Sequence, residues 1–239
     1  MCGIGGFWGL NNSEDATKLF ASISDRGKHA CGFAVSWPQL REPSLPILVM
    51  KRPFSSTKWL NNSKALPFNR LDSVLMCHTR YATKGDKYNM DNNHPIIYGK
   101  TILTHNGMLR NDDEIFKTLG CERIGQVDSE ALAAAIELKG IDWAVQNCVG
   151  SMSIAWMNQD KPTELNFFTN GLNPLCFGIY DDETVVYASW PHHLKAIGKK
   201  IEWYYAQTGV HYTVKEGNIF MRDIEGNWSD PMLEQNGVY

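Results

Sequence analysis

The feature that most limits the fold is a series of short runs rich in β-branched and aromatic residues, spread along most of the chain. Runs of about four to eight such residues, bounded by Gly, Pro, Asn or Asp, predict β-strands. The expected strands are Ile4–Trp8, Gly32–Trp37, Pro46–Lys51, Val74–His78, Thr101–His105, Ser151–Met157, Glu164–Thr169, Cys176–Tyr180, Thr184–Ala188, Val210–Val214 and Asn218–Met221.

Helical patterns are fewer and lie in groups. We expect helices at Asp15–Ser22, at Asp112–Leu119 between an Asn111 cap and a Gly120 stop, and at Ser129–Lys139 before Gly140. The third is largely apolar, which predicts packing between layers. Many strands with grouped helices favour a layered α+β fold over a doubly wound parallel sheet. The Pro-rich segment from Pro38 to Pro67 is expected to be a long surface excursion.

Composition describes an ordinary globular chain with one domain over residues 1–239. It is 43% hydrophobic with a net charge of -3, so no nucleic-acid or membrane surface is expected as a partner. No apolar stretch reaches about 18 residues and no signal peptide is visible, which predicts a cytoplasmic protein. Six scattered cysteines without a Cys-x-x-Cys pair predict free thiols, with no metal or cofactor.

Cys2 follows the initiator methionine directly, in Met1-Cys2-Gly3-Ile4-Gly5-Gly6. Removal of Met1 would place a thiol nucleophile and a free α-amine on one residue. An α-amine titrates near pH ~8 and a thiol near ~8.5, so we expect an available base and an easily formed thiolate. A cysteine at position 2 can equally be a small inert side chain.

Two polar clusters follow apolar strands. Arg80 lies beside the hydroxyls of Thr79 and Tyr81 at the end of one strand, which suits a bidentate grip on a carboxylate, although a surface salt bridge is the plainer role. Asn106 and Gly107 end another strand, where an amide and a backbone N–H could stabilise an oxyanion. Asn-Gly is also the commonest hairpin turn.

Two further sites carry weaker signals. Asp128 precedes the Ala-rich helix and could receive an ammonium group, but N-capping explains its position fully. The segment Ser24-Asp25-Arg26-Gly27 reads by itself as a polar loop entering a strand.

Together these motifs resemble one family. Met-Cys-Gly-Ile-x-Gly, Arg-Gly-x-x-x-x-Gly, His-Thr-Arg-Tyr-Ala-Thr-x-Gly, Asn-x-His-Pro (Asn92 to Pro95), His-Asn-Gly and Asp-Ser-Glu occur in the order of the class II glutamine amidotransferase domain. This is the N-terminal-nucleophile glutaminase of glucosamine-6-phosphate synthase, amidophosphoribosyltransferase and asparagine synthetase. The middle third is most similar to the glucosamine-6-phosphate synthase version, and a weak resemblance continues to the end of the chain.

The resemblance implies a four-layer αββα sandwich and a glutaminase mechanism. Cys2 would attack the side-chain amide of L-glutamine, with its own α-amine as base, and a thioester would then be hydrolysed. The other roles implied are oxyanion stabilisation by Asn106 and Gly107, and substrate binding by Arg80, Tyr81, Thr83 and Asp128, with Arg26 in support.

The sequence departs from relatives at three positions: Lys84 replaces a His, Asn173 an Arg, and Trp190 a Glu. No synthase half is recognisable, so the expected partner is a separate ammonia-accepting synthase subunit of unknown identity, and the chain could also pair with copies of itself. Two alternatives stay open: an N-terminal-nucleophile hydrolase of another amide, and a catalytically silent binding subunit.

Overall fold

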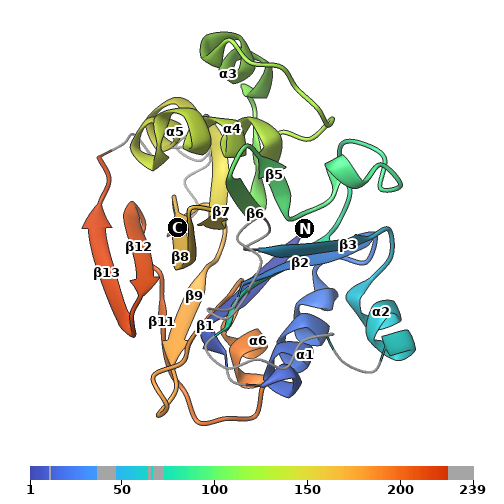
Figure 1. Ribbon diagram of the computed structural model, residues 1–239, viewed down its shortest axis with the longest axis vertical. Coiled ribbons are helices and arrows are strands. Elements are labelled where there is room, and N and C mark those ends of the chain that lie inside the picture. The colour runs from blue at the N-terminus through green and yellow to red at the C-terminus, as the bar shows by residue number, and fades with distance from the viewer. Residues whose placement is uncertain (11, 37–46, 64–65, 67–72, 226–239) are drawn as a thin grey trace, which may run out of the picture.

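The computed structural model describes residues 1–10, 12–36, 47–63, 66 and 73–225. Two antiparallel sheets pack face to face, and helices cover the outer face of each sheet (Figure 1). In the view of Figure 1, α1, α2 and α6 lie below the sheets and α3, α4 and α5 above them. The expected layered α+β fold, an αββα sandwich, is confirmed.

The first sheet carries the N-terminal strand at its centre. Its strand order is β11-β9-β10-β1-β4-β2-β3. The strands are β1 (Gly3–Leu10), β2 (Ala30–Ser36), β3 (Leu48–Arg52), β4 (Ser73–Arg80), β9 (Cys176–Ile179), β10 (Val185–Ala188) and β11 (Glu202–Tyr205). The covering helices are α1 (Ser13–Ser22), α2 (Ser56–Ser63) and α6 (Pro191–Lys195), and the 3-10 turn η1 (Ile23–Asp25) follows α1.

The second sheet has the order β13-β12-β8-β7-β6-β5. Its strands are β5 (Ile96–Tyr98), β6 (Thr101–Leu109), β7 (Gly150–Asn158), β8 (Lys161–Thr169), β12 (Val210–Lys215) and β13 (Asn218–Asp223). It is covered by α3 (Asp112–Leu119), α4 (Ser129–Lys139) and α5 (Ile141–Asn147), and the 3-10 turn η2 (Met90–Asn92) precedes β5.

The central strands are apolar on both faces because each face borders a different core. In β4, Leu75 and Cys77 pack toward the helices, whereas Val74 and Met76 pack toward the other sheet. The core between the sheets is rich in aromatic rings, and Phe167 stacks on Tyr187 of the opposite sheet with ring centroids 5.8 Å apart. Strands buried on both faces therefore give continuous apolar runs rather than alternating ones.

The structure confirms the three expected helices, and each of the expected strands overlaps an observed strand within the described residues. The interpretation of residues 38–67 as a surface excursion is wrong in its described part, because the segment contains β3 and α2. Trp59 of α2 is buried, 5.4 Å from the ring of Phe33. Residues 38–46, 64, 65 and 67 of that segment lie outside the described residues, as do the ends Trp37 and Pro46 of two expected strands. Among the described residues, no helix is long and apolar enough to cross a membrane.

Candidate active site

The fold brings Cys2 and Arg80 together through strand pairing. Gly3 of β1 is opposite Thr79 of β4, so the preceding residue, Cys2, stands beside Arg80. A bond between the sheets adds β6 to this corner: Nε2 of His78 lies 3.1 Å from the carbonyl oxygen of His105. Because a carbonyl oxygen only accepts, Nε2 must donate. The ends of β1, β4 and β6 therefore meet at one site.

The Cys2 thiol contacts the backbone at the end of β4. The amide N–H of Tyr81 donates to Cys2 Sγ at 3.4 Å, and Sγ lies 3.8 Å from the carbonyl oxygen of Tyr81. Burial raises the pKa of the Cys2 thiol above its ordinary value, and the Tyr81 hydrogen bond and the nearby Arg80 charge only partly offset this. This direction of shift is opposite to the easily formed thiolate expected from the sequence.

The carbonyl group of Cys2 is held by two side chains. Arg26 Nε donates to the Cys2 carbonyl oxygen at 2.6 Å. The Asn106 amide satisfies its neighbours when its oxygen accepts from Arg26 Nη2 and its nitrogen donates to the Cys2 carbonyl, both at 3.2 Å. This orientation leaves the second N–H of the Asn106 amide for another acceptor. Arg26, expected only as a supporting residue, thus connects the backbone of Cys2 to the expected oxyanion donor.

Asn106 and Gly107 lie inside a strand and do not form a hairpin turn. β6 continues to Leu109, with Asn106 opposite Ser153 and Gly107 opposite Met152 of β7. A Cβ at position 107 would lie 1.9 Å from the carbonyl oxygen of Ser151, so only glycine fits this close approach. The turn interpretation of this dipeptide is excluded.

Asp128 stands at the N-cap position of α4 but makes no capping hydrogen bond with its side chain. Its Oδ2 instead accepts from the amide N–H of Leu109, at 2.6 Å, two residues beyond Gly107. The carboxylate is therefore fixed against the end of β6. The capping explanation of its position does not describe this side chain.

Arg80 is almost fully buried and holds the loop that follows β4. Its Nη1 donates to Asn93 Oδ1 at 2.8 Å, and its Nη2 donates to the carbonyl oxygens of Lys84 and, at 3.0 Å, Gly85. The Arg80 guanidinium thus does not form a surface salt bridge, and several of its N–H groups donate to other parts of the protein. The role of Asn93 was not found from the sequence, where it stood only inside the Asn92-to-Pro95 motif.

Contacts outside this corner fix the same loop. Lys84 Nζ lies 2.7 Å from Asp112 Oδ2 at the start of α3, and the same carboxylate oxygen accepts from Arg123 at 2.7 Å. Thr83 is exposed, and its side chain makes no hydrogen bond to another described residue. The Tyr81 ring is also exposed and lies 4.7 Å from the His29 ring, so in this structure Tyr81 meets Cys2 only through its backbone.

Beneath this corner lies a pair of buried imidazoles. The rings of His78 and His94 stack with centroids 4.0 Å apart. Burial lowers the pKa of His78 to about 3 and that of His94 well below its ordinary value. Both rings are therefore neutral at neutral pH and add no positive charge to the site.

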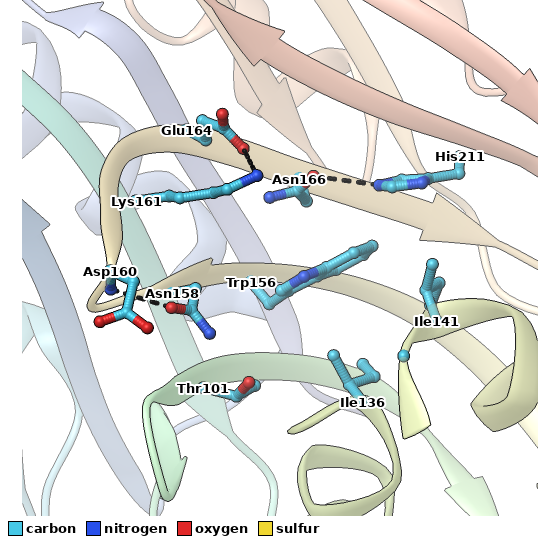
Figure 2. A pocket seen from close by; sticks show the side chains of 11 residues that line it. Thr101, Ile136, Ile141, Trp156, Asn158, Asp160, Lys161, Glu164, Asn166 and His211 are labelled. Atoms are coloured by element: carbon cyan, nitrogen blue, oxygen red, sulfur yellow. Dashed lines mark hydrogen bonds and ion pairs between the residues drawn. The ribbon is translucent and has the colours of Figure 1, made fainter. Parts of the chain in front are cut away.

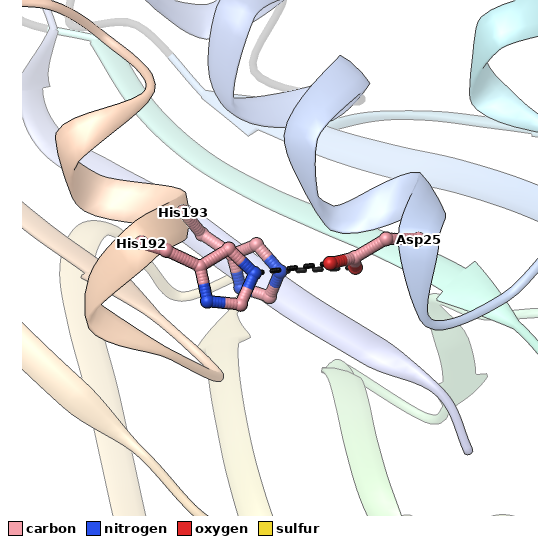
Figure 3. Close-up of side chains that lie close together, drawn as sticks. All are labelled: Asp25, His192 and His193. Carbon is pink, nitrogen blue, oxygen red and sulfur yellow. Dashed lines mark hydrogen bonds and ion pairs between the residues drawn. The ribbon is translucent and has the colours of Figure 1, made fainter.

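A second group of side chains borders Arg26. Asp25 faces the adjacent imidazoles of His192 and His193 of α6 (Figure 3), with Oδ2 3.0 Å from His192 Nε2 and Oδ1 3.0 Å from His193 Nε2. These three residues are the group among the described residues whose ligand atoms could surround a metal ion. Partial burial would raise the pKa of Asp25, but hydrogen bonds from both imidazoles lower it overall.

A cavity of about 410 Å³ opens elsewhere, between β6, β7, β8, β12 and the adjoining ends of α4 and α5 (Figure 2). Thr101 lines it, at the opposite end of β6 from Asn106 and Gly107. Its walls include Trp156, Asn166 and His211 but none of the site residues expected from the sequence. The cavity is therefore separate from the Cys2 corner.

Solved structures share this fold. The glutamine phosphoribosylpyrophosphate amidotransferase of B. subtilis matches 95% of this chain and 50% of its own, with a TM-score of 0.76 and 21% identity. A glutamine aminotransferase class-II domain protein from Silicibacter pomeroyi matches 94% of this chain and 100% of its own, with a TM-score of 0.55 and 14% identity. At these identities the likeness shows a shared fold, that of the N-terminal-nucleophile amidotransferases.

The sequence comparisons give the family. Residues 78–196 match the family model of the glutamine amidotransferase domain. A glutamine–fructose-6-phosphate aminotransferase of Acinetobacter baylyi is 28% identical over 195 residues, 75% of this chain and 30% of that protein. One from Neisseria meningitidis serogroup A is 34% identical over 123 residues, 46% of this chain and 20% of that protein. Residues 78–196 therefore carry a glutamine amidotransferase domain, and the chain spans less than a third of the length of the curated relatives it matches.

Proposed function

We propose that this chain hydrolyses the side-chain amide of L-glutamine at Cys2, releasing glutamate and ammonia. The observation that carries the proposal is the grip on Cys2: Arg26 and Asn106 hold its carbonyl oxygen while the Tyr81 N–H meets its thiol. Two side chains on its backbone carbonyl and one N–H on its thiol fix the position of Cys2 more closely than packing alone would require. Membership of the glutamine amidotransferases supports glutamine as the source of the amide.

The chemistry runs in two steps. After removal of Met1, the α-amine of Cys2 takes the thiol proton, because burial keeps the thiol protonated. Sγ forms a bond to the amide carbon, the C–N bond breaks, and the proton goes to the leaving nitrogen as ammonia departs. Water then attacks the thioester, the C–S bond breaks, and glutamate leaves as the thiol is restored.

The oxyanion that forms in each step requires preorganised donors. Asn106 is held by Arg26 so that its nitrogen, not its oxygen, faces the Cys2 side, and Gly107 supplies a backbone N–H at the same strand end. Donors fixed before the reaction stabilise the developing charge without reorganisation. We assign Asn106 and Gly107 to the oxyanion site.

Glutamine also carries an α-carboxylate and an α-ammonium group. We assign the carboxylate to Arg80 and to the segment of Tyr81 and Thr83, and the ammonium group to Asp128. The donors of Arg80 that are not used by Asn93, Lys84 and Gly85 remain for a ligand. Asp128 is the carboxylate fixed beside the end of β6, where charge pairing with an ammonium group is favourable.

We further propose that the ammonia is passed to a separate synthase subunit. Ammonia released into water at neutral pH is mostly protonated and no longer nucleophilic. The exposed apolar side chains of Tyr81 and Met108, next in sequence to Arg80 and Gly107, support a protein surface docking near the site. The loop from Thr83 to Asn92 is the segment we expect to adjust on docking.

The test is a glutaminase assay on purified protein whose intact mass has been measured. Met1 should be absent, and Cys2→Ala should abolish glutamate release while glutamine binding and the folded state persist. Asn106→Ala should lower kcat by about 10²–10³-fold, the usual cost of one oxyanion donor. Full activity with Met1 retained would rule out the α-amine as base.

The partner and the alternatives are separated by further measurements. Fractions of native lysate that contain the synthase should raise kcat/KM at least about tenfold, which is about 1.4 kcal/mol. High turnover by the isolated chain with no stimulating fraction would indicate a free-standing glutaminase. Turnover of other amides without glutamine dependence would indicate a different hydrolase, and no turnover with intact Cys2 would indicate a binding subunit.

A further inference from the structure

Arg26 is part of a closed ring of contacts with Asp25, His193 and Trp190. Asp25 precedes it in the chain and accepts from His193 through Oδ1. His193 Nδ1 accepts from the backbone N–H of Trp190 at 3.2 Å. The ring of Trp190 in turn faces Arg26, with the guanidinium carbon 6.0 Å from the ring centroid. Both flanks of Arg26 are thus tied to the start of α6, more than 160 residues away in sequence.

The hydrogen bonds of His193 determine where its proton lies. A backbone N–H can only donate, so Nδ1 accepts and the proton of the neutral imidazole is on Nε2. Nε2 then donates to Asp25, which as a carboxylate only accepts. His193 is 0% exposed, and its burial lowers its pKa, so the neutral ring is the stable form. Each polar atom of the imidazole therefore has one matching partner.

This arrangement argues against a metal ion between Asp25 and the two histidines. A metal would need the lone pair of His193 Nε2, which would move the ring proton to Nδ1. That proton would then face the N–H of Trp190, two donors against each other. A pair of hydrogen bonds to one carboxylate fits the geometry without this conflict.

We propose that Asp25, His193 and Trp190 are positioning residues that hold the Arg26 guanidinium on the Cys2 carbonyl and on Asn106. This inference rests on the proposed function, because its consequence is the alignment of the nucleophile and the oxyanion donor. Arg26 is the shared element: Nε holds the carbonyl oxygen of Cys2, and Nη2 keeps the oxygen of Asn106 turned away from it. The long side chain of Arg26 is flexible, so its guanidinium must be fixed by its neighbours.

His192 plays a lesser part. Its ring contacts Asp25 Oδ2 from the solvent side, with 62% of its side chain exposed, and within the part of the chain that the structure describes its ring makes no hydrogen bond to Trp190. A pair at that exposure contributes little. The contacts of His193 with Asp25 and Trp190 should therefore matter more for Arg26 than the contact of His192 with Asp25.

Asp25→Asn and His193→Ala are the variants that test the ring. In Asp25→Asn the amide nitrogen opposes one imidazole N–H, and in His193→Ala both hydrogen bonds of the ring are lost. We expect kcat for glutamine hydrolysis to fall about tenfold or more with KM changed less than about threefold, because Arg80 and Asp128 are untouched. His193→Gln, which can restore a donor to Asp25, should recover part of the loss, and His192→Ala should stay within about twofold of wild type.

Asp15→Asn is the matched control for a merely structural role. Asp15 is a largely buried carboxylate that also ties two parts of the helical layer together, through Lys199 at 2.6 Å, but it has no contact with Arg26. Its substitution should lower Tm while leaving kcat unchanged. If Asp15→Asn and Asp25→Asn lost kcat equally at equal loss of Tm, the contacts of Asp25, His193 and Trp190 would contribute to stability and not to the positioning of Arg26.

A second measurement does not depend on turnover. In wild type the Arg26 Nε–H, bonded to the Cys2 carbonyl, should exchange slowly with solvent in nitrogen-15 NMR, and in Asp25→Asn it should exchange at least about tenfold faster. Unchanged exchange, with kcat of Asp25→Asn and His193→Ala within about twofold of wild type, would overturn the inference. Stoichiometric Zn²⁺ binding that is lost in His193→Ala would overturn it too, in favour of a metal site. Slow exchange of the Arg26 Nε–H in a wild-type protein without glutaminase activity would refute the proposed function but not the positioning of Arg26.

Discussion

Substitution of Gly107 by alanine tests the oxyanion site through the backbone. Its ideal Cβ would lie 1.9 Å from the carbonyl oxygen of Ser151 and 2.4 Å from His105 Nε2. An ordinary contact of this kind begins near 3.4 Å, so β6 and β7 must separate locally by roughly 1 Å or more. Neither strand can yield cheaply, because the two are paired from Thr101 to Leu109.

The size of the effect follows from that displacement. A shift of about 1 Å in a catalytic group can cost about 10²-fold in rate, so kcat should fall by at least about 10²-fold. Overpacking a buried site costs about 1–3 kcal/mol, which for a chain of this size lowers Tm by about 2–12 °C. Glutamine hydrolysis followed by glutamate release, with Tm from thermal unfolding, measures both.

Gly120→Ala serves as the comparison variant. Gly120 has φ of 65° and nothing within 4 Å of an added Cβ, so alanine there costs about 1–2 kcal/mol of backbone strain without moving the site. Its kcat should equal that of wild type. If Gly107→Ala kept its kcat within about threefold of wild type while folded, the assignment of this strand end to the oxyanion site would be refuted.

Three other outcomes are expected. Asp128→Asn should raise KM for glutamine at least about tenfold with little change in Tm, because the amide oxygen can still accept from Leu109 while the charge is lost; an unchanged KM would return Asp128 to a structural role. Because burial raises the pKa of the Cys2 thiol, alkylation of protein that retains Met1 should accelerate about tenfold per pH unit from about pH 7 to about pH 9, and a plateau below pH 8 would contradict this. The pKa values of His78 and His94 are lower in the folded protein than the unfolded value of about 6.5, so the unfolded chain binds more protons as the pH falls from about 6.5 toward about 3. Tm should therefore drop through that window, and it should drop less steeply in His94→Gln.

The sequence was a good guide to the strands and to the site's location, for a physical reason. Strands buried on both faces leave continuous apolar runs, and polar residues at the ends of β4 and β6 interrupt them visibly. The motif resemblance then identified the family, which the comparisons confirm. The assigned roles of the site residues stay proposals.

What the sequence could not provide depends on tertiary contacts. β5 and α6 are short, at three and five residues, and carry too few periods for a pattern to register. The Asn106-Gly107 dipeptide has the composition of a turn, and only pairing with β7 keeps it extended. The hydrogen bond between Asp25 and His193 joins residues 168 positions apart, and neither local sequence contains a pattern that predicts it.

The central position of β1 has a consequence for synthesis. β1 is synthesised long before Ser189, yet Ile4 exchanges hydrogen bonds with that residue, 185 positions later. Until β10 has emerged, β1 lacks one of its two neighbours, and the amino terminus stays open to the aminopeptidase that would remove Met1. A tag fused to the amino terminus would keep the aminopeptidase from reaching Met1, so recombinant protein should carry its tag at the other end.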